Sequence, residues 1–312
     1  MNARCPPVLT ASSEAVFGSA ARGDVDSMSD RDILIVDDDV AVLRERGRQL
    51  SEAGWSVASY TFAKLEALSN RGALFIQHIK LESSILVDRD SRLAQKLAAF
   101  SPRSSYSDEI RDNGLLASLA GDTPIGPRGT LLAADILYVT VRNFGVLSLA
   151  ERGIHVFAYN AVIEALESHG FIARGGARAL AALRFLKCLY RAGEVGDAYH
   201  ARVTVEQALS MLPNKHFPTK LRVVPADMIL MASGPPGTAS AYLQLRDLER
   251  RLVALQGLER SAALDEKLRT LSRWIENPRA YASLSSRLAP SMRKLMLRHM
   301  RHEQLRGSIL SG

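Results

Sequence analysis

The hydrophobic pattern changes its period along the chain. Within residues 15–100, short apolar runs suited to β-strands alternate with segments whose apolar residues recur every three or four positions, as in helices. The strands predicted from this pattern are Val16–Phe17, Asp32–Val36, Trp55–Tyr60 and Ser84–Val87, and the helices are Val40–Ala53 and Lys64–Leu81. We therefore expect a small domain with a mixed sheet over residues 1–100.

The rest of the chain has a helical pattern. Residues 101–130 are rich in Ser, Pro and Gly and predict a connector with at most one short helix. Helical spacing follows at Leu131–Asn143, Phe157–Ser168, Ala177–Arg191 and Thr204–Leu212, where Thr204 and Gln207 match a capping box and Gly170 and Gly193 match terminators. The sequence thus predicts an α+β fold in which the mixed-sheet domain (1–100) and connector (101–130) precede an all-helical C-terminal region (131–212 and 213–312).

The positive charge is confined to the last hundred residues. The chain has a net charge of +7, and residues 213–312 hold 17 lysines and arginines against 8 aspartates and glutamates. The densest part follows Pro290, the expected first residue of a final helix. Such a helix could hold RNA through its phosphates, face an acidic partner, or be an ordinary solvated surface. In the same region, Leu245, Leu248, Leu252 and Leu255 share one helix face, which we expect to pack internally.

Other features of the sequence favour a cytoplasmic protein. Apolar residues make up 47% of the chain, enough for a core, but we find no apolar stretch of the length that crosses a bilayer. The N-terminus lacks the apolar block of a secretory signal. Cys5 and Cys188 are too few and too far apart for a disulfide framework or a zinc site. We expect a cytoplasmic location, no membrane association and two free thiols.

A Gly-Ser turn and a spaced pair of aspartates stand close together near the N-terminus. Gly18 and Ser19 follow the first predicted strand, and Asp30 and Asp32 introduce the second. Alternate residues of a strand face the same side, so the two carboxylates would repel each other unless a cation offset their charge. Magnesium suits such a pair because it takes oxygen ligands and leaves positions for phosphate oxygens. Because a glycine allows close approach to a ligand and helix-start amides attract anions, the pattern indicates nucleotide chemistry.

This pattern resembles the DNA-polymerase-beta-like nucleotidyltransferase superfamily, in which an apolar residue, Gly-Ser, a short spacer and Asp-x-Asp follow one another. The motif, Gly-Ser-x-Ala-Arg-Gly-Asp followed by Ser-Asp-x-Asp, is most similar to that of the small bacterial nucleotidyltransferases. The resemblance implies that Gly18, Ser19 and Arg22 bind the phosphates of a nucleoside triphosphate such as ATP. It also implies that Asp30 and Asp32 bind two Mg²⁺ ions and are the catalytic acids. The helical segment 131–212 would be the substrate-side domain that such enzymes often append.

The chain departs from the family pattern at one point. Most members have a third acid on a later strand, but the expected segment Gly54–Phe62 contains no Asp or Glu, and Ser56 or Ala58 would occupy that position. Glu82 and Asp88 are the nearest acids that could substitute, although Glu82 is more typical of a helix end or a solvated residue. Asp37, Asp38 and Asp39 fit a solvated turn and helix N-cap.

No other residues indicate a separate chemistry. The histidines are scattered, without partners at metal or triad spacing. Tyr138 and Arg142 lie four residues apart on one predicted helix and could line the cleft, but a core position for Tyr138 and a surface ion pair for Arg142 are favoured.

Three functions follow. The leading hypothesis is a metal-dependent nucleotidyltransferase that moves a nucleoside monophosphate onto a hydroxyl of RNA, a protein or a small molecule. The second is a catalytically impaired member that binds nucleotide or RNA in a regulatory or defence role. The third is an interaction protein that uses the domain as a scaffold. The missing third acid favours the last two, and the intact turn and acid pair favour the first.

Overall fold

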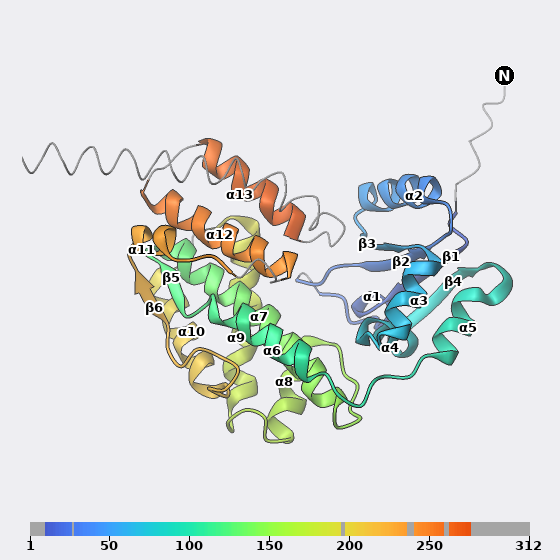
Figure 1. Cartoon of the computed structure of the whole chain (residues 1–312), viewed down its shortest axis with the longest axis horizontal. Helices are drawn as coiled ribbons and strands as arrows, with labels where there is room; N and C mark the ends of the chain where they lie inside the picture. The colour runs from blue at the N-terminus through green and yellow to red at the C-terminus, as the bar shows by residue number, and fades with distance from the viewer. Residues whose placement is uncertain (1–9, 27, 195–196, 236–239, 259–261, 276–312) are drawn as a thin grey trace, which may run out of the picture. The chain divides into compact units, whose positions relative to one another are not determined.

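The computed structural model describes residues 10–26, 28–194, 197–235, 240–258 and 262–275 (Figure 1). Its contacts divide the chain into two compact units. The first runs through Glu109 and includes Arg142–Leu166, whereas the second comprises Ile110–Val141 and the described residues from Glu167 onward. Helices α7 and α8 therefore contribute to both units. Whether the four segments expected from the sequence are domains in their own right stays a prediction.

The first unit is built on a four-stranded mixed sheet in the order β3-β2-β1-β4. Its strands are β1 (Ser13–Phe17), β2 (Asp32–Val36), β3 (Ser56–Tyr60) and β4 (Ser83–Asp88). Strand β1 runs antiparallel to β2 and β4, and β2 runs parallel to β3. All four predicted strands are present, although β1 begins three residues earlier than its short apolar run suggested. The α+β fold class is confirmed.

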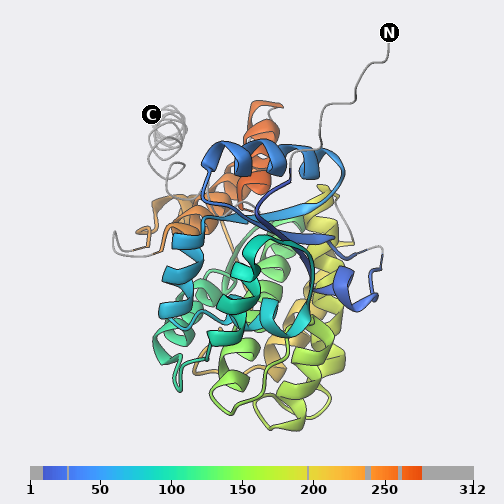
Figure 2. The ribbon, with the colours of Figure 1, turned by 90° about the vertical axis from the view of Figure 1, so that its right-hand side faces the viewer.

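Helices cover both faces of this sheet (Figures 1 and 2). Ile33 and Ile35 of β2 pack against α2 (Val40–Glu52), whereas Leu34 and Val36 face a second core that α3 (Phe62–Asn70), α4 (Leu74–Glu82) and α5 (Arg92–Ala99) share. This alternation follows from the period of a strand. A short 3₁₀ turn, η1 (Arg89–Ser91), separates β4 from α5, and the single-turn α1 (Ser19–Arg22) follows β1.

The single helix predicted over Lys64–Leu81 is wrong. The chain forms α3 and α4 with a break at Arg71–Ala73, where Gly72 has a φ of +64° that other residues rarely adopt. The hydroxyl of Tyr106 donates a hydrogen bond of 2.9 Å to the carbonyl of Gly72 and fixes the break. As a result, α4 is an independent helix whose C-terminal residue, Glu82, leads directly into β4.

The remainder of the chain is mostly helical, with two short strands. Its elements are α6 (Ser107–Ser118), β5 (Asp122–Pro124), α7 (Pro127–Ala150), α8 (Tyr159–Ser168), α9 (Gly176–Ala192), α10 (Ala198–Met211), β6 (Arg222–Val224), α11 (Ala226–Met231), α12 (Ala241–Leu258) and α13 (Ala262–Ile275). Strands β5 and β6 pair in parallel, so the region expected to be all-helical contains a small sheet.

The expectation of at most one short helix over residues 101–130 is also wrong. This segment contains the whole of α6, strand β5 and the first residues of α7. Gly126 and Pro127 read as loop residues in the sequence, but Pro127 is the first residue of α7, where a proline needs no hydrogen-bond partner for its nitrogen. Asp108 and Glu109 likewise favour the first turn of α6 through their charge.

The expectations for the later helices have mixed outcomes. Gly193 ends α9 as predicted, and Leu245, Leu252 and Leu255 of α12 are buried, which confirms internal packing of that face. The capping box at Thr204 is wrong, because Thr204 lies inside α10 and the side chain of Asp197 caps that helix instead. The final helix expected after Pro290, and the basic cluster within it, lie outside the described residues.

Helix α7 corrects one expectation about apolar stretches. Among the described residues it is the one helix whose length and composition would suffice to cross a membrane, but most of it is buried within the protein. Its Asp135 is fully buried and pairs with Arg246 at 2.6 Å and with Arg191 at 2.8 Å. Arg246 also approaches Glu249 at 3.1 Å, and Glu249 accepts a hydrogen bond of 2.7 Å from the hydroxyl of Tyr190. We take α7 as a core helix whose buried charge is balanced by α9 and α12.

Candidate nucleotide and metal site

The Gly-Ser turn lies where β1 ends and α1 begins. Gly18 has a φ of +64° and a ψ of −141°, a backbone conformation that disfavours any residue with a Cβ atom. Its N–H donates to the carbonyl of Glu82 at 3.1 Å, which ties the turn to the start of β4. The hydroxyl of Ser19, expected to hold phosphate, donates to the carbonyl of Asp30 at 3.1 Å. The turn and the segment of the acid pair are therefore joined directly.

Asp32 is the first residue of β2 and lies beside the turn. A Cβ atom placed on Gly18 would be 3.5 Å from Oδ2 of Asp32, so a side chain at this position would lie in contact with the carboxylate. Partial burial raises the pKa of Asp32, and the negative charge of Asp30 raises it further. A hydrogen bond from Ser56 and the nearby His78 and Arg142 oppose that rise. Asp32 is thus a carboxylate whose charge is not fully compensated by the protein.

Asp30 is exposed and precedes the strand. Its charge acts on Asp32, which supports the expectation that the two acids lie close together. Arg31 between them points away, with its guanidinium 4.2 Å from the ring centre of Trp55. Its side chain therefore covers apolar surface on the opposite face of the sheet, as the alternation of the strand requires.

Ser56 is one of the two residues, with Ala58, at which the resemblance would place a third acid. It lies directly opposite Asp32 in the parallel pairing of β2 and β3 and hydrogen-bonds to the Asp32 carboxylate. A hydroxyl cannot supply the charge that a third carboxylate would bring to a metal ion. The described residues contain no group of three or more His, Cys, Asp or Glu side chains placed to hold a metal ion.

Glu82 and His78 extend the site beyond the residues that the motif predicted. Glu82 is at a helix end, as expected, but it is not solvated, because its side chain is only 17% exposed and pairs with Arg22. Nε2 of His78 lies 3.3 Å from Oε2 of Glu82. His78 therefore has a carboxylate neighbour, although this pair is neither a metal site nor a catalytic triad. The four-residue spacing of His78 and Glu82 on one helix is the sequence signal that would have revealed this pair.

Arg142 brings a second positive charge close to the acids. Its Nε donates to the carbonyl of Phe157 at 3.2 Å, and its charge helps to hold down the pKa of Asp32. The C-terminal half of α7 is held in the first unit by a cluster in which Ala150 and Phe157 pack with Leu74 and Tyr106. The surface ion pair expected for Arg142 is wrong, because its partner is a backbone carbonyl near the site.

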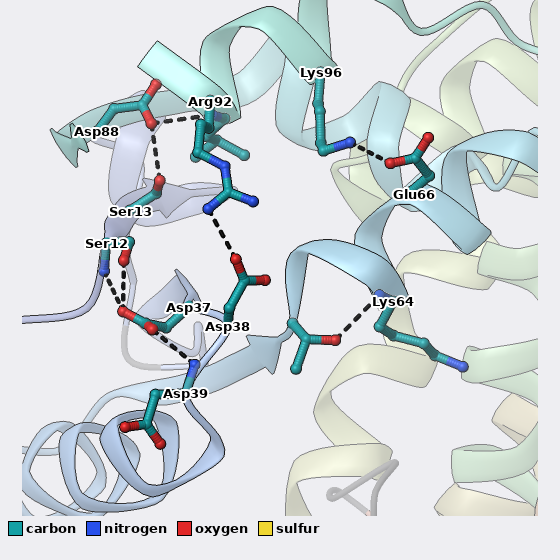
Figure 3. Close-up of polar contacts among 12 residues, drawn as sticks. Ser12, Ser13, Asp37, Asp38, Asp39, Lys64, Glu66, Asp88, Arg92 and Lys96 are labelled. Carbon is teal, nitrogen blue, oxygen red and sulfur yellow. Dashed lines mark hydrogen bonds and ion pairs between the residues drawn. The ribbon is translucent and has the colours of Figure 1, made fainter. Parts of the chain in front are cut away.

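The remaining acids singled out in the sequence lie at the opposite end of the sheet (Figure 3). Asp39 caps α2, as predicted, by accepting from the N–H of Ala41. Asp37 is buried rather than solvated and accepts bonds of 2.7 Å from both the N–H and the hydroxyl of Ser12. Asp88 accepts from the hydroxyl of Ser13 and from two amides at the start of α5. It pairs across the sheet with Ser13, whereas the motif end of β1 is Phe17, so Asp88 cannot replace the third acid.

The assembled residues combine an anion-binding and a cation-binding character. Gly18, Arg22 and Arg142 offer a backbone turn without a side chain and two positive charges, and Asp30 and Asp32 offer carboxylate oxygens. Such oxygens suit Mg²⁺, which commonly uses one or two carboxylates and completes its shell with water and substrate phosphates. The residues present therefore fit a metal-bound nucleoside triphosphate.

Protein-family models, curated proteins and solved structures give no match to this chain. The likeness to nucleotidyltransferases consequently rests on the motif residues and on the geometry described above.

Proposed function

We propose that this chain is a metal-dependent nucleotidyltransferase that moves a nucleoside monophosphate from a nucleoside triphosphate to a hydroxyl acceptor and releases pyrophosphate. The observation that supports this best is the contact between the Gly18 turn and Asp32. Two segments separated by a loop meet so that an open backbone turn faces a carboxylate of raised pKa. A divalent cation would neutralise the carboxylate, and a polyphosphate would bind at the turn.

In this reaction the acceptor oxygen forms a bond to the α-phosphorus, and the bond between that phosphorus and the oxygen bridging to the β-phosphate breaks. Asp30 and Asp32 would hold Mg²⁺, which supplies charge to offset the phosphates and stabilises the leaving pyrophosphate. Arg22 and Arg142 would bind the phosphate oxygens through guanidinium donors. Ser56 offers no carboxylate at the position expected for a third acid, so the proton of the acceptor hydroxyl would pass to solvent.

A second function is favoured by Ser56. Without a third carboxylate, the same site would bind a nucleotide with one metal ion and transfer it slowly or not at all. The chain would then act as a nucleotide- or RNA-binding module, or as a protein-interaction module, in a regulatory or defence role.

Radiolabelled nucleoside triphosphates separate these functions. Each labelled nucleoside triphosphate would be incubated separately with the protein and Mg²⁺. Total RNA, total protein or a small-molecule extract would be supplied as the acceptor. We expect label to pass to one acceptor class from the wild type but not from the Asp30→Asn/Asp32→Asn variant. Asp38→Asn is a matched control, because Asp38 is an exposed acid paired with Arg92 at the other end of the sheet.

The outcomes are distinct. Calorimetric binding of Mg²⁺ and nucleotide without any transfer would favour the second function. No binding by the wild type would reject both. An RNA acceptor would further require binding that weakens steeply with salt, with a log–log slope of about −0.7 per phosphate contact for a single strand. Deleting residues 286–312 should flatten that slope if the basic C-terminal residues hold the RNA.

A further inference from the structure

Glu82 joins three elements of the candidate site. It is the last residue of α4, and its carboxylate pairs with Arg22 of α1 and lies 3.3 Å from Nε2 of His78, one turn earlier in α4. Its own carbonyl accepts the N–H of Gly18. Backbone and side chain of one residue therefore hold both the turn and the arginine that follows it.

His78 cannot move away from Glu82 easily. Its ring stacks on Phe157 with 4.5 Å between ring centres and an interplanar angle of 19°. Phe17 meets it edge-on at 5.5 Å. Aromatic contacts of these two kinds are favourable and directional, so the imidazole is held in one orientation behind the carboxylate. The side chain of His78 is only 11% exposed.

Arg22 is fixed by two carboxylates and still has donors to spare. Its Nε donates to Asp24 at 3.1 Å and its Nη1 pairs with Glu82. A guanidinium carries five N–H donors in a planar fork, so the donors not used by these acids remain for a phosphate. The side chain of Arg22 is 28% exposed, which leaves it open to a ligand at the turn.

We propose that Glu82 is a positioning residue that, supported by His78, holds the Arg22 guanidinium ready to bind the triphosphate of the nucleotide. This inference rests on the proposed function. It identifies a second feature, besides the Gly18 turn, that fixes the groups of the phosphate site in place. A fixed arginine binds phosphate better than a free one because less side-chain entropy is lost on binding.

The alternative role for Glu82 is that of the missing third acid. Burial acts to raise the pKa of Glu82, but His78 and Arg22 outweigh that effect and hold the pKa below its ordinary value. A carboxylate stabilised in this way is a poor proton acceptor and is already neutralised by a cation. Its contacts therefore suit positioning rather than catalysis.

The direction in which Glu82→Gln changes the nucleotide affinity distinguishes positioning from simple charge repulsion. Glu82→Gln removes a negative charge close to a polyanion site, so through-space electrostatics alone predicts tighter binding of Mg²⁺ and a non-hydrolysable ATP analogue. Loss of positioning predicts weaker binding, by about ten-fold if one charge-assisted phosphate contact is lost. Glu66→Gln is the matched control, because Glu66 pairs with Lys96 at 2.6 Å elsewhere in the same unit. Calorimetry would measure both, and circular dichroism would verify folding.

Further variants test whether Glu82 affects nucleotide binding through Arg22. In an Arg22→Ala background, Glu82→Gln should have no additional effect, because the residue that it positions is gone. Glu82→Asp should restore part of the affinity. His78→Phe keeps the stacking surface but loses the nitrogen beside Glu82, and should weaken binding less than Glu82→Gln. NMR of the Arg22 Nη protons, which contact Glu82, should show faster solvent exchange and side-chain motion in Glu82→Gln.

These measurements distinguish failure of the positioning role from failure of the proposed function. Equal or tighter nucleotide binding by Glu82→Gln, or an unchanged signal from the Arg22 Nη protons, would overturn the positioning role while leaving the proposed function intact. Failure of the wild type to bind the ATP analogue would overturn the proposed function, and the phosphate role of Arg22 with it.

Discussion

Gly18 and Asp32 approach each other so closely that a methyl group on Gly18 would touch the carboxylate, with 3.5 Å between the Cβ position and Oδ2. Gly18 also has a positive φ of 64°. The backbone conformation of Gly18 therefore disfavours a side chain, and a side chain there would also lie in contact with the carboxylate. These two effects can be separated by experiment.

Gly18→Ala should lose nucleotide binding, whereas Gly23→Ala should retain it. Gly23 also has a positive φ, of 78°, but nothing lies within 4 Å of its Cβ position. Gly23→Ala should therefore lose about 1 kcal/mol of stability from backbone strain, and Gly18→Ala should lose more, because its ψ of −141° lies outside the left-handed helical region. Thermal unfolding would measure these two costs, and calorimetry would measure binding. Equal nucleotide affinity in the two variants would remove the Gly18–Asp32 contact from the site.

Asp32→Asn should stabilise the fold at neutral pH while abolishing transfer. Burial and Asp30 raise the pKa of Asp32 above its ordinary value of 3.8, so the folded state binds a proton more tightly than the unfolded state. The charged form therefore lowers stability above the folded-state pKa, and this penalty disappears as the pH falls below 3.8. Melting temperatures of wild type and variant between pH 3 and pH 8 would show the gain shrinking at acid pH.

The effect of Mg²⁺ on the melting temperature gives a second test of the role of Asp32. Mg²⁺ should raise the melting temperature of the wild type, because a cation bound by Asp30 and Asp32 stabilises only the folded state. It should leave Asp32→Asn unchanged. A variant that is less stable than the wild type at pH 7 would contradict the assigned environment of Asp32.

Asp88→Ala should lower stability by about 1 kcal/mol at pH 7, as loss of a helix cap does. Burial acts to raise the pKa of Asp88, but bonds from Ala94, Leu93 and Ser13 hold it below its ordinary value of 3.8. Its contribution is therefore complete above pH 3.8 and is lost as the pH falls through the folded-state pKa. The difference in unfolding free energy between the wild type and the variant should shrink accordingly. Asp38→Ala, which removes only the surface pair with Arg92, should cost less.

Asp135→Ala should destabilise the second unit by about 3–5 kcal/mol, because it removes the carboxylate that Arg246 and Arg191 share and leaves Glu249 as the one buried acid paired with Arg246 among the described residues. Arg246 is 1% exposed and Asp135 fully buried. Urea unfolding would measure the loss. Replacing both residues with apolar ones, in Asp135→Leu/Arg246→Met, should recover little of it, because Glu249 and Arg191 then lose their partner charges. A single variant as stable as the wild type would show that the pair contributes nothing.

The sequence alone determined the local elements of the first unit and the residues of the motif. Strand β2 and helix α2 were predicted almost to the residue, because the alternation of Ile33 and Ile35 and the N-cap at Asp39 are local signals. The pairing of turn and acid pair could also be expected from their spacing. What the sequence misassigned were segments in which glycine and proline begin or interrupt helices, at Gly72 and Pro127.

The tertiary structure alone decided which residues surround the motif. Arg142 lies more than a hundred residues from Asp32, and Glu82 reaches Arg22 only because β4 pairs with β1. The opposite ends of β4 place Glu82 at the site and Asp88 away from it, although the two acids are six residues apart. Pattern and propensity act between neighbours in the chain, whereas such a site is assembled by strand pairing and helix packing between segments distant in sequence.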